Sequence, residues 1–365
     1  MKKVVGLLLL FCLVWVCRAD EPEGYYDAAL HKKGIELKET LFGIINEHTK
    51  LTYKALWDAY LQTDADADSN IIDIYNECPF KFRVDQHSGG SSGSKTNQCL
   101  KYNREHSFPK SWFHETKEGS PMYTDLFHLY PVSGYVNSRR NNNPFGEVAN
   151  PEETFTGGSK LGNCTFPGYT GTVYEPLDQY KGDLARTYFY MATCYHDKIA
   201  TWTSDMLAGN NQDDFTEWSK ELLLKWHLQD TVSEKERRRN DSVFKIQGNR
   251  NPFIDHPELV EKIWGDDTVG WGDTALEPNP TPGDTVDIQN PFWNKCSVTV
   301  SNRFLQIDYS AGQMESVEIF NTSGSRICAT FVRQSRFGYR LPAAGIYIVR
   351  IGVGKRQFTR KVAVL

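Results

Sequence analysis

Apolar residues recur at helical spacing in the first part of the chain. The stretches 35–48 and 52–61 each gather their apolar side chains on one helical face, which predicts two helices that turn that face to a core. The stretch 183–200 is apolar or aromatic at most positions, so it predicts a helix that is buried on all sides. These patterns indicate a largely helical region.

Two further helices are expected after the buried one. Residues 213–227 repeat bulky apolar side chains on one face, and residues 233–246 are mostly polar. The second stretch opens with Ser233 and, three residues later, Glu236, which is a capping-box arrangement. Both stretches therefore read as helices, one amphipathic and one polar, with Arg237, Arg238 and Arg239 in the middle of the second.

A different order of elements is predicted between the second and third helices. Extended strands are expected at 101–106 and 124–131. A helix should begin near Ser133, which is a suitable N-cap, and run through Arg139 and Arg140. The order strand, loop, strand, helix is that of a ββα-metal finger.

The composition changes near residue 265. Residues 266–287 are rich in proline, glycine and aspartate without any period, which is typical of a linker. Residues 288–365 then alternate short β-type runs with turn residues, which predicts a small β-sandwich. The expected fold class is α+β, with a mixed, largely helical domain over 20–265 and an all-β domain at the end.

The first nineteen residues have the anatomy of a secretory signal peptide. Two lysines precede an apolar run over 4–16, and a small residue, Ala19, ends the segment. The apolar run is too short for a comfortable transmembrane helix, so no transmembrane segment is expected. Cys17 allows a lipoprotein interpretation, but the residues before it lack the small side chain that such processing favours. We expect cleavage and export to the cell exterior or surface, with the periplasm in transit.

Charge limits how such a protein could hold nucleic acid. The formal net charge is −5, and loss of the three basic residues of the signal peptide takes it to −8. That is the wrong sign for binding nucleic acid by bulk charge. A nucleic-acid enzyme with this balance must concentrate its basic residues locally.

Six cysteines remain after the signal peptide, which permits disulfides in an exported chain. Cys78–Cys99 would close the glycine- and serine-rich loop 86–98, which should be exposed, and Cys296–Cys328 would lie in the tail. Buried free thiols are an equally good interpretation. No cysteine and histidine spacing indicates zinc.

The candidate chemistry lies at 104–106 and at Asn137. His106 could act as a general base, because imidazole titrates near neutral pH. Glu105 and Asn137 could hold one Mg²⁺ through oxygen, with Mn²⁺ or Ca²⁺ as alternatives. Neighbours in a regular strand point to opposite faces, so Glu105 and His106 share a pocket only if the strand bends or ends there. Taken alone, the Arg-Glu-His tripeptide is usually structural, and an asparagine near a helix start is usually a cap.

Basic residues around this set are candidates for contact with nucleic acid. They are Arg104, Lys110, Arg139 and Arg140. An arginine pair on a helix is ordinarily a solvated face. The prediction is raised by the combined order of strand, loop, strand and helix, with His106 at the end of the first strand and Asn137 on the helix. These side chains would contact phosphates and carry no sequence preference.

The chain resembles a known family in several separated motifs. YNREHSFPKSWF (102–113) and DLFHLYPVSGYVNSRRNNNPFGEV (125–148) look like the core of the secreted endonuclease I family, nucleases of the His-Me finger group. The resemblance continues at 181–195, 218–241 and 245–258. It implies a mixed α/β nuclease with His106 as general base.

The resemblance also implies a site and a substrate. Mg²⁺ would be held by Glu105 and Asn137, and DNA and often RNA would be cut to 5′-phosphate ends with little sequence preference. Some relatives carry an arginine between the two strands that steadies the product phosphate, but residues 107–124 contain none. Arg140 or Arg186 could take that catalytic role.

The tail resembles the type IX secretion sorting domain. The segments NPFWNKCSVTVSN, SVEIFNTSGSRI, LPAAGIYIVRIG and KRQFTRKVAVL carry the likeness. It implies that the secretion machinery is a partner. A carbohydrate-binding or adhesion module is the alternative, but few aromatic residues are placed for stacking on a sugar.

The leading hypothesis is a monomeric, secreted, Mg²⁺-dependent non-specific endonuclease. A sequence-specific nuclease of the homing type would keep the same core, but export separates such an enzyme from its own chromosome. The alternative from another class is a secreted nucleic-acid-binding or adhesive protein with an inactive nuclease core. The presence of His106 and Asn137 argues against that alternative.

Overall fold

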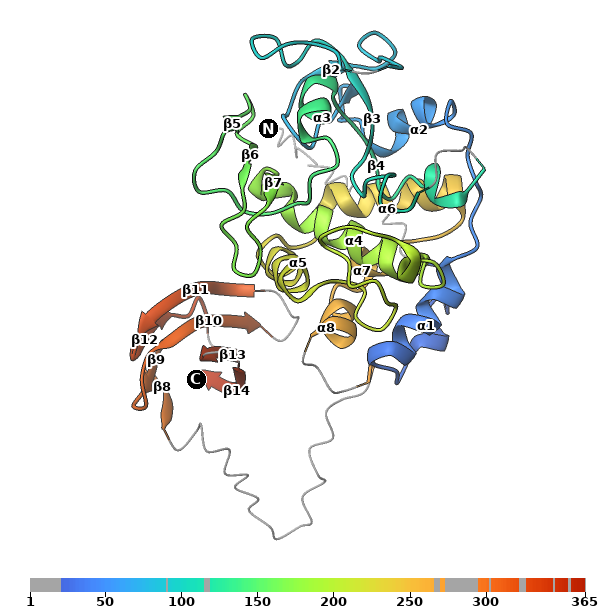
Figure 1. The fold of residues 1–365 in the computed structure, drawn as a ribbon. Helices are drawn as coiled ribbons and strands as arrows, with labels where there is room; N and C mark the ends of the chain where they lie inside the picture. Colours follow the sequence, from blue (N-terminus) through green and yellow to red (C-terminus); the bar gives the residue numbers. More distant parts are fainter. Residues whose placement is uncertain are drawn as a thin grey trace, which may run out of the picture. The chain divides into compact units, whose positions relative to one another are not determined.

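The computed structural model describes residues 21–89, 91–114, 119–265, 270–272, 295–301, 303–321, 326–343, 345–353 and 356–364. It divides into two compact units, Met1–Leu276 and Glu277–Leu365 (Figure 1). The signal peptide and most of the predicted linker lie outside the described residues, so both stay predictions. Within the described part of the chain, no helix combines the length and apolar character needed to span a membrane.

Helices form most of the first unit. The helices predicted from periodicity are confirmed, and α4 is buried along its whole length, as the apolar pattern of 183–200 indicated. It packs against α1, α5 and α7, while α6 packs against α2. The α-helices are α1 (Gly34–Ile45), α2 (Leu56–Thr63), α3 (Gly134–Arg140), α4 (Lys181–Cys194), α5 (Glu217–Gln229), α6 (Glu234–Gln247), α7 (Pro252–Asp255) and α8 (Leu259–Trp264). Short 3-10 helices occupy Asp27–Ala29, Pro121–Tyr123, Asp178–Tyr180 and Ile199–Thr201.

The capping chemistry agrees with the sequence at two helix starts. Ser233 caps α6 in a capping box with Glu236, which satisfies two backbone donors at once. The side chain of Ser133 accepts a hydrogen bond from the backbone N–H of Val136 at the start of α3. Tyr53 was expected inside the second helix, but α2 begins only at Leu56.

Small antiparallel sheets complete the first unit. One pairs β1 (Asn70–Ile71) with β2 (Phe80–Lys81), and another joins β5 (Glu153–Thr154), β6 (Lys160–Asn163) and β7 (Thr172–Glu175). The hairpin of β3 (Tyr102–His106) and β4 (Leu129–Ser133) leads directly into α3. The second predicted strand, 124–131, thus begins later than expected, because Asp125 folds back to accept the backbone N–H of Phe127.

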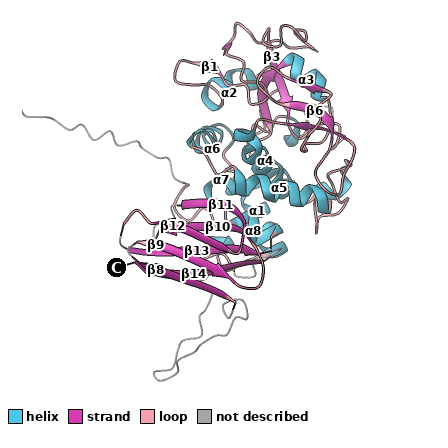
Figure 2. Cartoon of the chain, turned by 90° about the vertical axis from the view of Figure 1, so that its left-hand side faces the viewer, coloured by secondary structure: helices cyan, strands magenta, loops and turns pink. Residues whose placement is uncertain are grey.

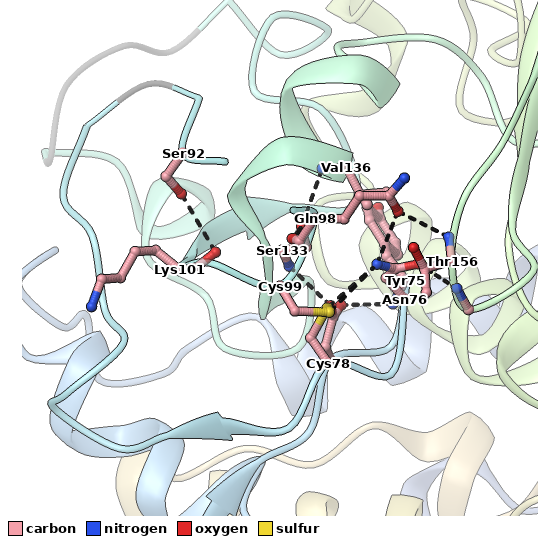
Figure 3. The surroundings of a disulfide bond; sticks show 12 residues. Tyr75, Asn76, Cys78, Ser92, Gln98, Cys99, Lys101, Ser133, Val136 and Thr156 are labelled. Atoms are coloured by element: carbon pink, nitrogen blue, oxygen red, sulfur yellow. Dashed lines mark hydrogen bonds between the residues drawn. A yellow bond between two sulfur atoms is a disulfide. The ribbon is translucent and has the colours of Figure 1, made fainter. Parts of the chain in front are cut away.

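A disulfide stands beside this hairpin (Figure 3). Cys78 and Cys99 are bonded, as predicted, and Asn76 donates its amide to the sulfur of Cys78 and to the side chain of Gln98. The carbonyl of Gln98 accepts from the hydroxyl of Ser133, the cap of α3. Gln98 is therefore buried, although its loop was expected to be exposed.

The second unit is all β. A four-stranded sheet runs β11-β10-β13-β14 and a three-stranded sheet runs β12-β9-β8 (Figure 2). One apolar core takes residues from both sheets, among them Leu305, Val317 and Val349. The strands are β8 (Cys296–Ser301), β9 (Phe304–Tyr309), β10 (Met314–Asn321), β11 (Arg326–Gln334), β12 (Arg336–Arg340), β13 (Gly345–Val353) and β14 (Arg356–Val364).

The predicted Cys296–Cys328 disulfide is wrong. Both cysteines are free thiols, and they lie on strands of different sheets, β8 and β11. Cys164 and Cys194 are also free and buried, which agrees with the alternative interpretation of these positions.

Candidate functional site

A cavity of about 340 Å³ opens where β3 ends. It brings together the sequence candidates Arg104, Glu105, His106, Lys110 and Asn137, which come from β3, the loop that follows β3, and α3. The other lining residues are Tyr53, Pro109, Ser111, Ser138, Asn141 and Asn142. The base, carboxylate and amide candidates therefore share one cavity.

Consecutive residues reach the same cavity because it lies at the end of the strand. Asn103 and Glu105 face α3, where they contact Asn137 and Arg140 at 2.7 and 2.8 Å. Side chains alternate along a strand, so Arg104 and His106 face the other way. On that side the guanidinium of Arg104 lies 3.5 Å from the ring centroid of Tyr53. Both faces border the cavity where β3 stops at His106.

His106 is held in one tautomer. Its Nε2 lies 3.0 Å from the carbonyl oxygen of Tyr123, and a carbonyl can only accept, so Nε2 carries the proton. The ring packs among Tyr53, Tyr123 and His128. Burial lowers the pKa of His106 well below its usual value, with further lowering by His128, Lys110 and Arg104. At neutral pH the ring is therefore neutral, with Nδ1 as its unprotonated nitrogen.

Glu105 is a buried carboxyl whose Oε1 has two donors. The hydroxyl of Tyr75 lies 3.1 Å away and Nη1 of Arg140 lies 2.8 Å away. Burial raises the pKa of Glu105 to about 7, and Arg140 and Tyr75 oppose that rise. No sequence pattern pointed to Tyr75, because it lies thirty positions before Glu105.

Arg140 donates hydrogen bonds to the backbone at the end of β3. Its guanidinium is fully buried and donates to the backbone carbonyls of His106 and Ser107, at 3.2 and 2.8 Å. A fully buried side chain cannot touch a substrate phosphate, so the predicted direct contact with nucleic acid does not fit its position. Arg140 instead contacts Glu105 and does not line the cavity.

Arg186 stands elsewhere in the first unit. Its guanidinium forms a two-point ion pair with Glu236, at 2.6 and 2.7 Å, and donates to the carbonyl of Asp230. It is fully buried and does not line the cavity. The catalytic role predicted for Arg186 therefore does not fit, because its donors are taken up by a structural pair.

Asn137 projects from α3 toward the strand. Its Nδ2 donates to Oδ1 of Asn103 at 2.7 Å, so the amide of Asn137 has a preferred orientation. Since the nitrogen faces Asn103, Oδ1 of Asn137 is the atom presented on the other side. Asn103 has no sequence signal of its own and was missed.

The remaining basic candidates differ in availability. Arg104 stacks on Tyr53 and on Trp57, 4.4 Å from its ring centroid, and donates to the carbonyl of Tyr53. Lys110 is exposed at the rim of the cavity. Arg139 is half-exposed, but its Nε is paired with Glu153 at 2.7 Å and it does not line the cavity. Arg104 and Lys110 are thus the two basic side chains of the cavity wall.

Among the described residues, one group of His, Asp and Cys side chains has ligand atoms close enough for a metal. The atoms of His48, Asp125 and Cys194 lie within 4.8 Å of one another. Hydrogen bonds already satisfy the carboxylate, however, since its Oδ2 accepts from Tyr190 and Tyr195 at 2.8 and 2.7 Å. Burial also raises the pKa of the Cys194 thiol well above its usual value. This group reads as a polar core.

The comparisons with known proteins identify the class of the chain: its relatives are nucleases, which are phosphodiester hydrolases. The family model for endonuclease I matches residues 33–258, and the chain belongs to that family. The family is metal-dependent. Several relatives are named as extracellular or periplasmic nucleases, which supports a secreted protein.

Individual relatives cover much of the first unit. The chain is 37% identical over 249 residues to the extracellular ribonuclease of Bacillus amyloliquefaciens, covering 67% of this chain and 79% of that protein. It is 36% identical over 249 residues to the extracellular ribonuclease of Bacillus subtilis (strain 168), with the same coverage. It is 33% identical over 132 residues to endonuclease-1 of Buchnera aphidicola subsp. Baizongia pistaciae (strain Bp), covering 36% of this chain and 46% of that protein.

Proposed function

We propose that the protein is a secreted metal-dependent endonuclease that hydrolyses phosphodiester bonds of DNA and RNA to 5′-phosphate products without sequence preference. The observation that carries this proposal is the single cavity lined by His106, Glu105 and Asn137. Relatives named as a ribonuclease and as a deoxyribonuclease support both kinds of nucleic acid.

The donor set fits a hard divalent cation. We assign Oδ1 of Asn137 and the second carboxylate oxygen of Glu105, Oε2, as ligands of Mg²⁺, in the manner of a ββα-metal finger. Mg²⁺ prefers oxygen ligands and keeps several positions for water and phosphate, and Mn²⁺ or Ca²⁺ accept similar ligands. Bound there, the ion would offset negative charge on the scissile phosphate and on the leaving oxygen.

His106 acts as the general base in this proposal. The carbonyl of Tyr123 fixes the proton on Nε2, so Nδ1 takes the proton from the attacking water. The lowered pKa keeps the ring unprotonated and ready at neutral pH. After proton transfer the same carbonyl stabilises the imidazolium, because it accepts the Nε2–H.

Positioning and phosphate contact are divided among the basic residues. Arg140 holds Glu105 through Oε1 and so orients its other oxygen. Arg104 and Lys110 contact the phosphates next to the cut, and Arg104 supplies the guanidinium that 107–124 lacks. Contacts to phosphate carry no sequence information, which agrees with non-specific cleavage.

The ends of the chain complete the proposal. Residues 1–19 direct export and are removed. Residues 288–365 act as a sorting domain for the type IX secretion machinery, on the strength of their sequence motifs. The enzyme acts as a monomer outside the cell or at its surface.

A cleavage assay tests the proposal. Purified mature protein is incubated with supercoiled plasmid and Mg²⁺, with and without a chelator, beside His106→Ala. We expect progressive fragmentation that is abolished by the chelator and reduced by about 10² to 10⁴ in His106→Ala. His87→Ala, an exposed histidine outside the cavity, is the matched control and should cleave like the unaltered protein. Discrete bands would contradict non-specificity, and intact plasmid in every lane would favour a binding protein with an inactive core.

A further inference from the structure

The two parts of the chain carry opposite charge. Residues 288–365 contain 11 lysines and arginines and 3 acidic residues, a net charge of +8. Residues 20–287, which include the catalytic cavity, contain 27 basic and 43 acidic residues, a net charge of −16. A polyanionic substrate is therefore repelled by most of the catalytic unit and attracted by the sandwich.

Exposed arginines gather with an aromatic ring at one corner of the three-stranded sheet. Phe304 begins β9 and is 45% exposed, while its neighbour Leu305 is buried in the core. In the register of the sheet Phe304 pairs with Arg340, which is exposed, and the exposed Arg303 precedes it. We call Arg303, Phe304 and Arg340 the Phe304 corner.

A glycine makes room for this ring on the sheet. A Cβ placed on Gly338 would come within 2.6 Å of the ring of Phe304, so the tip of the ring lies over that position. A larger residue at 338 would displace the ring. An aromatic ring fixed beside guanidinium groups suits stacking of a base and contact with its phosphates.

Two arginines of the other sheet share one carboxylate. On the four-stranded sheet, Arg326 and Arg350 both pair with Glu318, at 3.2 and 3.4 Å. Among the described residues, no acidic side chain is paired with Arg303 or Arg340. The Phe304 corner is therefore the better site for an anion.

We propose that the Phe304 corner binds single-stranded stretches of nucleic acid, with Arg303 and Arg340 on the phosphates and the ring of Phe304 under a base. Polymeric substrate is thereby held on the same chain as the catalytic cavity, which raises its local concentration there. This inference rests on the proposed function, because holding a polymer is useful to the protein only if the protein cleaves it. It is a second use of the unit that we propose for sorting, and it applies while that unit stays attached.

Binding is measured without cleavage. The probe is a labelled oligothymidylate of about 30 nucleotides, its fluorescence anisotropy is titrated with full-length His106→Ala protein in chelator, and salt is varied between about 50 and 200 mM. The test variant adds Arg303→Gln and Arg340→Gln. The matched control adds Arg326→Gln and Arg350→Gln, which removes the same charge from the other sheet. Circular dichroism verifies that each variant is folded.

The expected results are specific to the corner. The Arg303/Arg340 variant should bind about fivefold or more weakly and lose about 1.4 from the slope of log K against log salt, because two phosphate contacts are lost. The control should change less than about twofold. Phe304→Leu keeps the apolar bulk but removes the aromatic face, and should weaken binding about fivefold. Equal weakening in both double variants would overturn the proposed site in favour of general attraction by charge. Unchanged binding by Phe304→Leu, or equally tight binding of inorganic polyphosphate, would overturn base stacking.

The effect on catalysis is measured in variants that retain His106. The Arg303/Arg340 variant should raise KM for long single-stranded DNA by the same factor, while kcat/KM for a trinucleotide stays unchanged. An unchanged KM for the polymer would contradict the holding role. Because the binding titration needs no cleavage, a protein that cuts nothing would refute the proposed function and leave the binding result to be judged separately.

Discussion

Replacing Asn103 with leucine should weaken metal binding by the enzyme without altering a residue of the cavity wall. Asn103 does not line the cavity, and its side chain accepts the amide N–H of Asn137 at 2.7 Å. Leucine has the same number and branching of side-chain heavy atoms but cannot accept that hydrogen bond. The amide of Asn137 would then lose the contact that keeps its oxygen turned toward the proposed ion.

The size of the effect on metal binding follows from the hydrogen bond between Asn103 and Asn137. A hydrogen bond between two amides contributes about 1 kcal/mol net, which corresponds to about a fivefold change in an equilibrium constant. Binding of the ion selects the amide orientation with oxygen inward, so a smaller population of that orientation lowers the apparent affinity by the same factor. We expect the Mg²⁺ concentration for half-maximal cleavage to rise about fivefold for Asn103→Leu. The kcat at saturating Mg²⁺ should change less than about twofold.

Two controls separate positioning from general loss of stability. Asn103→Asp keeps the acceptor, so its half-maximal Mg²⁺ concentration should equal or fall below that of the unaltered protein. Thr187→Val removes a hydrogen bond to the buried hydroxyl of Tyr130, 2.8 Å away, in the same unit. Asn103→Leu and Thr187→Val should both lower the Tm by about 2–4 °C, but only the former should shift the Mg²⁺ dependence.

The assay is plasmid cleavage over a Mg²⁺ titration, paired with direct titration of Mn²⁺ in the absence of substrate. An unchanged Mg²⁺ dependence in Asn103→Leu would refute the reasoning. So would an equal loss of metal affinity in Asn103→Asp, because that outcome would mean that the acceptor is not what orients Asn137. Failure of the unaltered protein to need metal would instead refute the proposed function.

Further predictions concern the same cavity and its support. Asn137→Asp should bind Mn²⁺ at least as tightly in a direct titration yet cleave plasmid more slowly, because it adds negative charge near the phosphate. Since burial raises the pKa of Glu105 to about 7, Mg²⁺ affinity measured by calorimetry should rise as pH increases through about 7, as the carboxyl ionises; a flat profile would contradict that pKa. In metal-free protein the raised pKa of Glu105 also contributes to the free energy of unfolding. This contribution is complete below a pH of about 4.5 and is lost as the pH rises through about 7. Denaturant titrations at several pH values would detect the loss. Arg104→Lys should raise KM for DNA several-fold in steady-state assays, because lysine offers no planar guanidinium to stack on an aromatic ring; an unaltered KM would remove Arg104 from phosphate contact. Replacing Cys78 and Cys99 together with alanine should lower the free energy of unfolding by about 3 kcal/mol, given their sequence separation of 21, and chemical denaturation would measure it.

Local pattern was sufficient for much of the fold. The periodicity of 35–48 and 183–200 predicted α1 and α4, because the face that a helix buries is written in its own spacing. Ser133 and Ser233 predicted two helix starts, since a cap bonds to backbone only two or three residues away. Whether Cys296 pairs with Cys328 could not be decided from local pattern, because the answer depends on which sheet each strand joins.

The candidate site could likewise be predicted from the sequence only in part. The sequence by itself placed His106 and Glu105 at the end of a strand and Asn137 on the helix that follows, and the structure brings these three to one cavity. It could not distinguish Arg104, which reaches the cavity wall, from Arg140, which is buried behind it.

The tertiary structure alone decided which partner each polar group meets. Tyr75 donates a hydrogen bond to Glu105, and the carbonyl of Tyr123 forms a hydrogen bond with the ring of His106. Glu236 forms an ion pair with Arg186. Spacing along the chain fixes the direction of a side chain only relative to its own helix or strand. Burial, pKa and the choice of hydrogen-bond partner depend on what other segments bring to that place, and these decide which residues are free to act on a substrate.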